Sequence, residues 1–523
     1  MGPARRSARR RRARPRIGRA ARRYRRRGRD DARSRGLSAG GGVNRREGLQ
    51  SVVVVGGGLV ALTAALGFAR ALPHATVTFV ATAPDPAALA DRLPAVTPQV
   101  AEAFDALGLD EAAMVAAGAA THRVGERFAW GDAAFTIGEG DGVPSVAGAA
   151  VHQLWLAHGD GPYDALVPAA TLAAAERFAP PASDPRSLLS RVNYTLRLDA
   201  DAATPFFAAA LRAARVRVVA PQQLRVVRDA DTVRALTMDD GGALTGDLFV
   251  DATGPAALLA AEDSAWLNWH DTLPVDRLLL GVAPPRPSPL DRYEATTDGW
   301  AARWPLAGRT LAGLAYASAT TSDARAAKQM PHTRERIAIR PRRQVVPFAG
   351  NVLALGDAAA TLGPLGWPGY TLALAQLELA LALMPARTPE PLLVAEYNRR
   401  ATLRADRFHA YAAAFYLVGR RRGDVWHALR TQVPPAELAT ALAQFGQRGT
   451  LPPLEEEMVP QAAWQQALIG LGVRPVRTDP LALSVPRASA VAALTQLRNA
   501  VAALPAGLPA YPEYLMAAQR GRR

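Results

Sequence analysis

The stretch Ser51-Val-Val-Val-Val-Gly56-Gly-Gly58-Leu59-Val60-Ala61 decides the fold that we expect for this chain. Its valine run is typical of a strand buried on both faces of a parallel sheet. Gly56, Gly58 and Ala61 follow at Gly-x-Gly-x-x-Ala spacing and open an apolar helical stretch at 59–72, before a second strand expected at 76–80. The first glycine permits a tight bend, the second lets backbone N–H groups approach a pyrophosphate, and the small third residue lets helix and strand pack closely. The sequence therefore predicts a βαβ unit that binds a dinucleotide at this turn.

Two later turns indicate the same kind of ligand, because their patterns are similar to those of FAD-dependent hydroxylases. An expected strand at 247–251 ends in Ala252-Thr253-Gly254, and another at 351–355 delivers Gly356-Asp357 to a turn before a helix near 369–383. In those hydroxylases the aspartate meets the ribityl chain, and a helix N-terminus faces the flavin. We therefore expect FAD to be held by Gly56, Gly58, Leu59, Val60, Ala61, Asp251, Gly254, Gly356, Asp357, Pro368, Gly369 and Tyr370.

The end of the second strand departs from the dinucleotide-binding pattern. An acidic residue usually binds the ribose hydroxyls at this place, but here the sequence is Val80-Ala81-Thr82, and Asp85 follows four residues late. We expect adenosine binding to be weaker than usual, or to be met by Thr82 or by backbone groups.

The chain as a whole is expected to form an α/β fold of the FAD-binding two-dinucleotide type, similar to flavoprotein monooxygenases. Helical patterns and loops alternate over 81–190, β-rich patterns cover 191–254 and 275–345, and helical patterns predominate from 388 onward. We predict a FAD-binding domain at 43–387, interleaved with a β-rich substrate region, and a helical C-terminal region at 388–523.

The net charge of +16 comes almost entirely from the first 42 residues, which hold 17 arginines and 2 aspartates. This composition predicts a disordered tail at 1–42. Such a tail is either an arm for an anionic partner or an upstream stretch included by the choice of start site, with Val43 as the alternative start. We favour the second interpretation, so a nucleic-acid partner is not expected.

Several classes of protein are disfavoured by composition. The chain has no cysteine, and its eight histidines show no HExxH spacing, so we expect no metal site. The most apolar stretch, 369–384, contains Gln376 and Glu378 and is too short to span a membrane. A cytoplasmic protein is therefore expected.

From about residue 50 to 517 the chain resembles the flavin-dependent tryptophan halogenases. The resemblance rests on the segments 104–111, 177–200, 298–306 and, most specifically, Ala463-Trp464-Gln-Gln-Ala-Leu-Ile-Gly470-Leu-Gly472. It implies FAD as cofactor, reduced flavin that reacts with O₂, and a small-molecule substrate. A separate flavin reductase and a second copy of the chain are the implied protein partners.

The resemblance fails at the residues that the family uses to halogenate. Arg123 stands where the family has its catalytic lysine, and arginine cannot form a haloamine or act as an acid near neutral pH. Gly366 replaces the catalytic glutamate and Trp367 its serine neighbour. The family binds halide on two backbone N–H groups that follow, and Pro368 lacks one of them. In the family's Trp-x-Trp-x-Ile-Pro signature, Ala302 and Trp304 replace the second tryptophan and the isoleucine.

Three functions follow from these observations. The first is a monooxygenase-type oxidoreductase that acts on a small aromatic or hydrophobic substrate, with Trp300, Trp304, Trp367 and His122 shaping the pocket. The second is a true halogenase of an indole-type substrate that uses Arg123. The third is a non-catalytic relative that binds flavin or a partner, which the missing acid at Ala81 favours.

Overall fold

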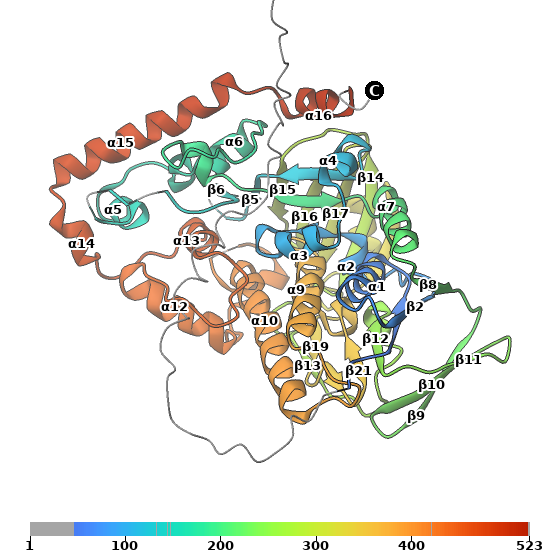
Figure 1. The fold of residues 1–523 in the computed structure, drawn as a ribbon. Coiled ribbons are helices and arrows are strands. Elements are labelled where there is room, and N and C mark those ends of the chain that lie inside the picture. Colours follow the sequence, from blue (N-terminus) through green and yellow to red (C-terminus); the bar gives the residue numbers. More distant parts are fainter. Residues whose placement is uncertain (1–46, 132, 144, 147, 420, 521–523) are drawn as a thin grey trace, which may run out of the picture. The chain divides into compact units, whose positions relative to one another are not determined.

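The computed structural model describes residues 47–131, 133–143, 145–146, 148–419 and 421–520 (Figure 1). The predicted tail at 1–42 lies outside these residues. The described part confirms the α/β class, since parallel strands and helices alternate in its first half. No helix in this part of the chain is long and apolar enough to cross a membrane.

The sheet that carries the glycine turns has the strand order β20-β21-β12-β1-β2-β8 in the described residues. All neighbours pair in parallel except β20 with β21. The valines of β1 are buried, as the continuous apolar run predicts for a strand covered on both faces. The strand bounds are β1 Ser51–Gly56, β2 Thr76–Ala81, β8 Arg217–Val219, β12 Leu248–Ala252, β20 Phe348–Ala349 and β21 Val352–Ala354.

A larger sheet, of order β18-β14-β17-β16-β15-β5-β6, is antiparallel except where β15 pairs with β5. It holds Trp300 and Trp304 on one strand, and the principal hydrophobic core lies against it. The strand bounds are β5 Gly125–Ala129, β6 Ala134–Gly138, β14 Arg277–Ala283, β15 Leu290–Ala295, β16 Gly299–Pro305, β17 Thr310–Tyr316 and β18 Thr333–Ala338.

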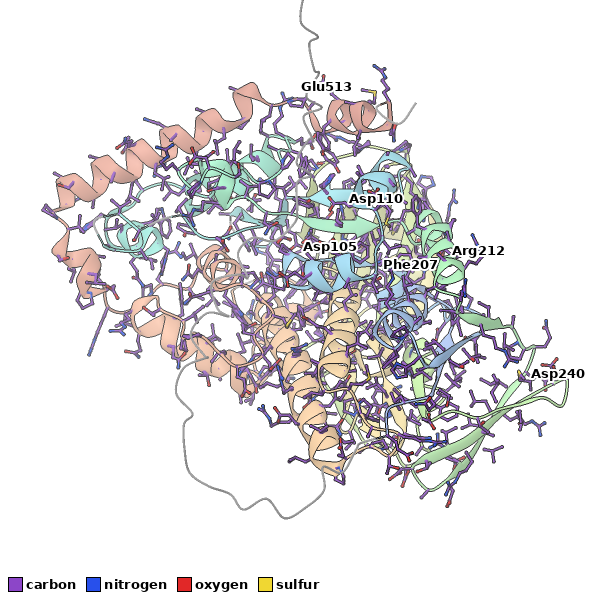
Figure 2. All side chains as sticks on the ribbon, viewed as in Figure 1. Asp105, Asp110, Phe207, Arg212, Asp240 and Glu513 are labelled. Atoms are coloured by element: carbon purple, nitrogen blue, oxygen red, sulfur yellow. The ribbon has the colours of Figure 1, made fainter. Side chains whose placement is uncertain are left out.

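Three short sheets complete the strands described: β3-β7-β4, β11-β10-β9 and β13-β19-β22. The sheet β11-β10-β9 is three-stranded and antiparallel, and Asp240 lies at its outer end (Figure 2). The strand bounds are β3 Ala95–Val96, β4 Ala120–Arg123, β7 Thr195–Leu198, β9 Leu224–Asp229, β10 Thr232–Met238, β11 Ala243–Leu244, β13 Trp266–Asn268, β19 Arg342–Gln344 and β22 Ala360–Thr361.

Helices cover the sheets and form the last part of the described chain. After residue 388 the described residues contain helices α10 to α16 and no named strand. The helix bounds are α1 Leu59–Ala71, α2 Leu89–Arg92, α3 Ala101–Ala106, α4 Glu111–Ala116, α5 Val151–His158, α6 Pro168–Ala174, α7 Ala200–Ala213, α8 Asp323–Gln329, α9 Pro368–Ala382, α10 Pro391–Leu417, α11 Asp424–Leu429, α12 Ala436–Arg448, α13 Gln461–Gly470, α14 Pro480–Ser484, α15 Arg487–Ala503 and α16 Tyr511–Arg520.

Two regional expectations need correction. The stretch 191–254 was expected to be β-rich, but it contains the 14-residue helix α7. Ala203, Phe207 and Leu211 are buried at a spacing of four, whereas Arg212 is exposed, which is a helical period (Figure 2). The stretch 81–190 was expected to hold helices and loops, yet it also supplies β3 to β6. These strands are short, and β3, β4 and β5 pair with strands distant in sequence, whereas β6 pairs locally with β5. Local periodicity over so few residues does not reveal them.

Candidate functional site

The turn after β1 depends on glycine for a close approach. A Cβ at Gly56 would stand 2.3 Å from the carbonyl oxygen of Ala252 and 2.7 Å from the Cβ of Ala61. Only glycine therefore lets β1, α1 and β12 pass this close together. Gly58 is the N-cap of α1 and provides no side-chain cap. The first amides of α1 are thus left for another acceptor.

The three turns predicted to hold FAD lie along one edge of the parallel sheet. β12 is the neighbour of both β1 and β21, and all three run in the same direction. Their carboxyl ends therefore meet at the same edge, where ligands of open α/β sheets bind. The turns Gly254–Ala256 and Gly356–Ala358 follow β12 and β21 directly.

Asp251 has a structural task within this edge. Its buried carboxylate accepts hydrogen bonds from the backbone N–H of Thr253 at 3.0 Å and of Leu259 at 2.7 Å. It also accepts one from the Thr253 hydroxyl at 2.6 Å. These bonds fix the turn after β12, so the side chain is directed at its own backbone.

The space between the three turns is filled by residues 85–92, which include α2. A Cβ at Gly254 would stand 2.8 Å from the Cβ of Ala88, and one at Gly369 would stand 3.0 Å from the Cα of Ala90. A Cβ at Gly58 would stand 2.1 Å from the carboxyl carbon of Asp91. The glycines of these turns, whose small size would admit a dinucleotide, are therefore in contact with residues 85–92. In this arrangement the edge does not accommodate FAD.

Two acidic side chains meet in this filled space. The Asp91 carboxylate accepts a hydrogen bond from the N–H of Val60 at 2.7 Å, and that of Asp357 accepts one from the N–H of Ala90 at 2.6 Å. Burial raises the pKa of both carboxyls to about 7; the charge of Asp85 further raises the pKa of Asp91, and the charges of Asp91 and Asp85 further raise that of Asp357. The edge therefore holds more negative charge than a phosphate-binding site would favour.

At the N-terminus of α9, the other predicted flavin contacts pack against α1. Pro368 is the first residue of α9. A backbone N–H at this position would have no partner within the helix, so proline removes no helical hydrogen bond. The Tyr370 hydroxyl lies 2.6 Å from the hydroxyl of Thr63, and both side chains are buried. Tyr370 therefore joins α9 to α1.

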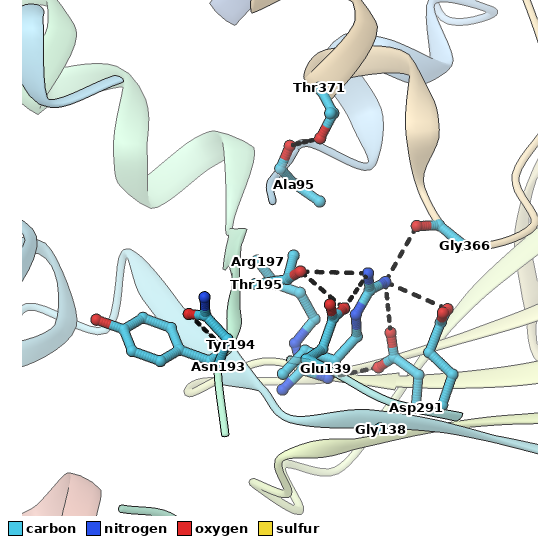
Figure 3. Close-up of polar contacts among 12 residues, drawn as sticks. Ala95, Gly138, Glu139, Asn193, Tyr194, Thr195, Arg197, Asp291, Gly366 and Thr371 are labelled. Carbon is cyan, nitrogen blue, oxygen red and sulfur yellow. Dashed lines mark hydrogen bonds and ion pairs between the residues drawn. The ribbon is translucent and has the colours of Figure 1, made fainter. Parts of the chain in front are cut away.

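The structure brings Arg123 and Gly366 together. The Arg123 guanidinium donates a hydrogen bond to the carbonyl oxygen of Gly366 at 3.0 Å. It also pairs with Glu126 at 3.3 Å, Glu139 at 3.0 Å and Asp291 at 3.5 Å. Figure 3 labels Glu139, Asp291 and Gly366 among the groups of this network. Burial lowers the pKa of Arg123, but these carboxylates outweigh burial and raise it above its ordinary value. The guanidinium is thus a fixed cation whose partners all belong to the chain.

A second buried arginine shares this network. Arg197 pairs with Asp291 at 2.5 Å, and neither side chain is exposed. Two arginines therefore face three carboxylates, those of Glu126, Glu139 and Asp291. Burial raises the pKa of Glu126 to about 7, although Arg123 lowers it. The Glu126 carboxyl therefore holds a proton more readily near neutral pH than an ordinary glutamate does.

The three predicted pocket tryptophans form a packed aromatic cluster. The rings of Trp300 and Trp304 lie 6.4 Å apart, and those of Trp304 and Trp367 lie 5.7 Å apart. All three side chains are at most 1% exposed, so in this arrangement they line no open hollow. Trp304 donates to the Tyr293 hydroxyl at 3.1 Å, whereas the Trp367 Nε1 is buried without a partner. Trp367 also has a positive φ of 58°, which is uncommon for a bulky residue.

His122 lies apart from these tryptophans. It alternates with Arg123 along β4, so the two side chains point to opposite faces of the strand. Its ring stacks on Phe178 at 4.1 Å, and its backbone N–H donates to the Tyr511 hydroxyl at 2.6 Å. Burial lowers the pKa of His122. The histidine thus anchors α16 to β4.

A hollow of about 260 Å³ lies between α10, α12 and the segment before α13. Its walls are mainly apolar, with charged side chains at Arg407, Glu437 and Glu457. Trp464 lines it, and the Tyr411 ring packs against Trp464 at 4.9 Å. Burial raises the pKa of Tyr411, and the charges of Glu126 and Glu139 raise it further. Tyr411 therefore links this hollow to the Arg123 network.

Sequence reasoning missed the acidic residues of both centres. Glu126 is three residues from Arg123, and this spacing alone could have suggested an ion pair. Glu139 directly follows β6 and Asp291 lies on β15, while Asp91 lies in the four-residue helix α2, which is too short to show a period, so no local pattern marks them. In the described residues, no group of three or more histidine or acidic side chains is arranged to hold a metal ion.

Comparisons with known proteins agree on one family. The tryptophan halogenase family model matches residues 51–487. Tryptophan 7-halogenase RebH from Lentzea aerocolonigenes is 26% identical over 255 residues, which is 45% of this chain. That match covers 48% of RebH, about half of its length.

Two solved structures are similar over nearly their whole length. BrvH, a flavin-dependent halogenase from Brevundimonas sp. BAL3, is 28% identical with a TM-score of 0.83. Xcc4156, a flavin-dependent halogenase from Xanthomonas campestris, is 25% identical with a TM-score of 0.82. Each match covers 90% of this chain, and 99% and 98% of the two relatives respectively.

Proposed function

This chain belongs to the tryptophan halogenase family, and we propose that it is a flavin-dependent oxidoreductase that does not halogenate. Its proposed substrate is a small aromatic or hydrophobic molecule, and its proposed cofactor is FAD, reduced by a separate reductase. We keep the reaction class of the family, and we leave out halogenation because the chain lacks suitable residues for that step.

The network around Arg123 carries this proposal. A group that delivers or orients a halogen species needs free hydrogen-bonding capacity toward the substrate. The two terminal nitrogens of Arg123 are already engaged by Glu126, Glu139 and the Gly366 carbonyl, which leaves the buried Nε as its one donor without a partner. Gly366 has no side chain that could serve as a base, and Pro368 has no N–H for a halide. These features disfavour a true halogenase that uses Arg123.

The apolar hollow supports a small, weakly polar substrate. Its volume of about 260 Å³ is near the lower limit of small-molecule pockets, which is about 300 Å³. Leu451, Pro452 and Trp464 offer apolar contact, while Arg407 and Glu437 could pair with a polar substituent. Trp300, Trp304 and Trp367 are not among the residues that line this hollow, so we assign them no contact with the substrate.

A second candidate function is a non-catalytic relative that binds no flavin. The observation that favours it is the position of residues 85–92 between the three glycine turns, where a dinucleotide would need to lie. The two candidates differ in whether that segment yields to FAD.

The test combines a binding measurement with an activity assay. The full chain is purified and titrated with FAD, and flavin fluorescence reports binding. The protein is then supplied with FAD, a flavin reductase, NADH, O₂, bromide and a panel of indoles, and products are analysed by mass spectrometry. We expect FAD to bind and the panel to contain no brominated product. Bromination would contradict the proposal, and the failure of FAD to bind at high concentration would favour the non-catalytic relative.

A further inference from the structure

The N-terminus of α1 already holds an anion, which is the carboxylate of Asp91. The N–H of Val60 donates to Asp91 Oδ1 at 2.7 Å, and the backbone of Leu59 also bonds to this carboxylate. Helix N-termini favour negative charge, because their amides have no partner within the helix and the helix dipole is positive there. Phosphate groups of dinucleotides use the same amides in this type of turn.

The contact between Asp91 and Gly58 shows how completely this position is filled. The carboxyl carbon lies 2.1 Å from the place that a Cβ of residue 58 would take. Gly58 is the second glycine of the turn, whose lack of a side chain allows a phosphate to approach the backbone. A phosphate and the Asp91 carboxylate would therefore compete for the same amides and the same space.

The segment that carries Asp91 is held by bonds of its own. The N–H of Ala90 donates to Asp357, and the carboxylate of Asp85 accepts from the N–H of Ala87 at 2.8 Å. Arg92 forms an ion pair with Glu335. The carboxylate of Asp91 repels the neighbouring carboxylates of Asp85 and Asp357. These contacts place the segment firmly enough to oppose a ligand, but they are few enough to be broken by one.

We propose that Asp91 is an internal competitor for the phosphates of a dinucleotide, so that FAD binds only when residues 85–92 withdraw from the turn. This inference rests on the proposed function, because FAD is the ligand expected there. It makes Asp91 a residue that sets the affinity for FAD rather than a catalytic residue.

The test compares the wild-type chain with Asp91→Gly and Asp91→Asn at pH 8, where the carboxylate is mainly ionised. FAD and inorganic pyrophosphate are the two probes, and calorimetry measures both affinities. We expect Asp91→Gly to bind each probe at least tenfold more tightly than the wild type. Asp91→Asn keeps the size of the side chain without its charge and should gain less. Thermal melting of each variant without ligand shows whether the fold is intact.

Asp110→Asn is the matched control. Asp110 caps α4 by accepting from the N–H of Ala113 at 3.1 Å, and it lies at the start of that helix, away from the turn (Figure 2). This control removes a capping carboxylate and should leave both affinities unchanged.

The outcomes separate this inference from the proposed function. If neither probe gains affinity in Asp91→Gly, the inference is overturned, and FAD binding by the wild type decides the function independently. If pyrophosphate gains affinity while FAD binds no variant, Asp91 is supported as a competitor and the flavin-dependent function fails. If both probes gain affinity, both proposals are supported.

Discussion

The glycine turns and the Arg123 network differ in how the chain satisfies its own charges. At the turns, backbone amides of α1 meet the carboxylate of Asp91, which comes from a short segment after β2. At Arg123, the guanidinium meets carboxylates on β5, β15 and the residue after β6, all within one sheet and its edge. The first arrangement can exchange its internal anion for a ligand by moving one segment. The Arg123 network cannot exchange its carboxylates for a ligand unless the strands that carry them also move.

This difference suggests why one part of the site keeps its family pattern while the other does not. The turn needs only glycines and correctly placed amides, which the sheet itself provides. The resemblance places Arg123 and Gly366 where the family's halogenating side chains are expected, and in this chain Arg123 takes part in a network of buried charges. The following predictions test the contrast from its largest expected effect to its smallest.

Asp291→Ala should be the most damaging change, because it leaves Arg197 buried without its ion-pair partner. Breaking a buried pair in this way lowers the free energy of unfolding by about 3–5 kcal/mol. Urea unfolding followed by circular dichroism measures the loss. The control is Asp184→Ala, whose pair with Arg186 is exposed and should contribute far less to stability. Equal effects of the two changes would contradict a rigid network at Arg123.

Gly58→Ala should destabilise the wild type only because Asp91 is present. The added Cβ would overlap the Asp91 carboxyl, and such overpacking lowers the free energy of unfolding by about 1–3 kcal/mol. In an Asp91→Gly background the same change should have an effect of less than about 0.5 kcal/mol, because the space is free. Gly58 has a φ of −120°, so alanine adds no backbone strain. An effect of equal size in both backgrounds would show that Asp91 does not fill the turn.

Glu126→Gln should reduce the dependence of stability on pH. The pKa of Glu126 is raised from 4.5 to about 7, so the folded state binds this proton more readily than the unfolded state. Its contribution is complete below pH 4.5 and is lost as the pH rises through 7. Between pH 5 and 8 the wild type should lose on the order of 1–2 kcal/mol more than the variant.

Urea midpoints at four pH values across this range measure that difference. Asp91 and Asp357 also have pKa values of about 7, so the variant should keep part of the slope. Glu396→Gln is the control, since its pKa is lowered by Arg399 and it does not titrate between pH 5 and 8. A variant slope equal to that of the wild type would mean that another group carries the proton.

The sequence predicted the fold in this chain better than the chemistry of its site. The valine run of β1, the glycine turn and the α9 helix have strong local periods, and the structure confirms them. The α/β class followed from these elements, and the convergence of the three turns followed from their parallel order. Helix α7 was missed because its apolar residues are widely spaced among alanines.

The networks could not have been predicted in the same way. The partners of Arg123 lie on strands separated by more than 150 residues, from Glu126 to Asp291, and only the sheet order brings them together. Asp91 lies in α2, a helix of four residues, which is too short for a period to determine its direction. The separation of His122 from the tryptophans depends on alternation along β4, which was not itself expected as a strand.

Trp367→Phe should have the smallest effect, and its comparison with Trp304→Phe tests how the aromatic cluster is built. The Nε1 of Trp367 is buried without a hydrogen-bond partner, so its removal takes away an unsatisfied donor. The Nε1 of Trp304 donates to the Tyr293 hydroxyl, which also accepts a hydrogen bond from the backbone N–H of Gly366. Both changes remove similar ring area, so Trp304→Phe should lower the free energy of unfolding by about 1 kcal/mol more than Trp367→Phe. If Trp367→Phe were the more damaging change, its indole N–H would have a partner in solution, and a polar ligand or water beside Gly366 would be the first candidate.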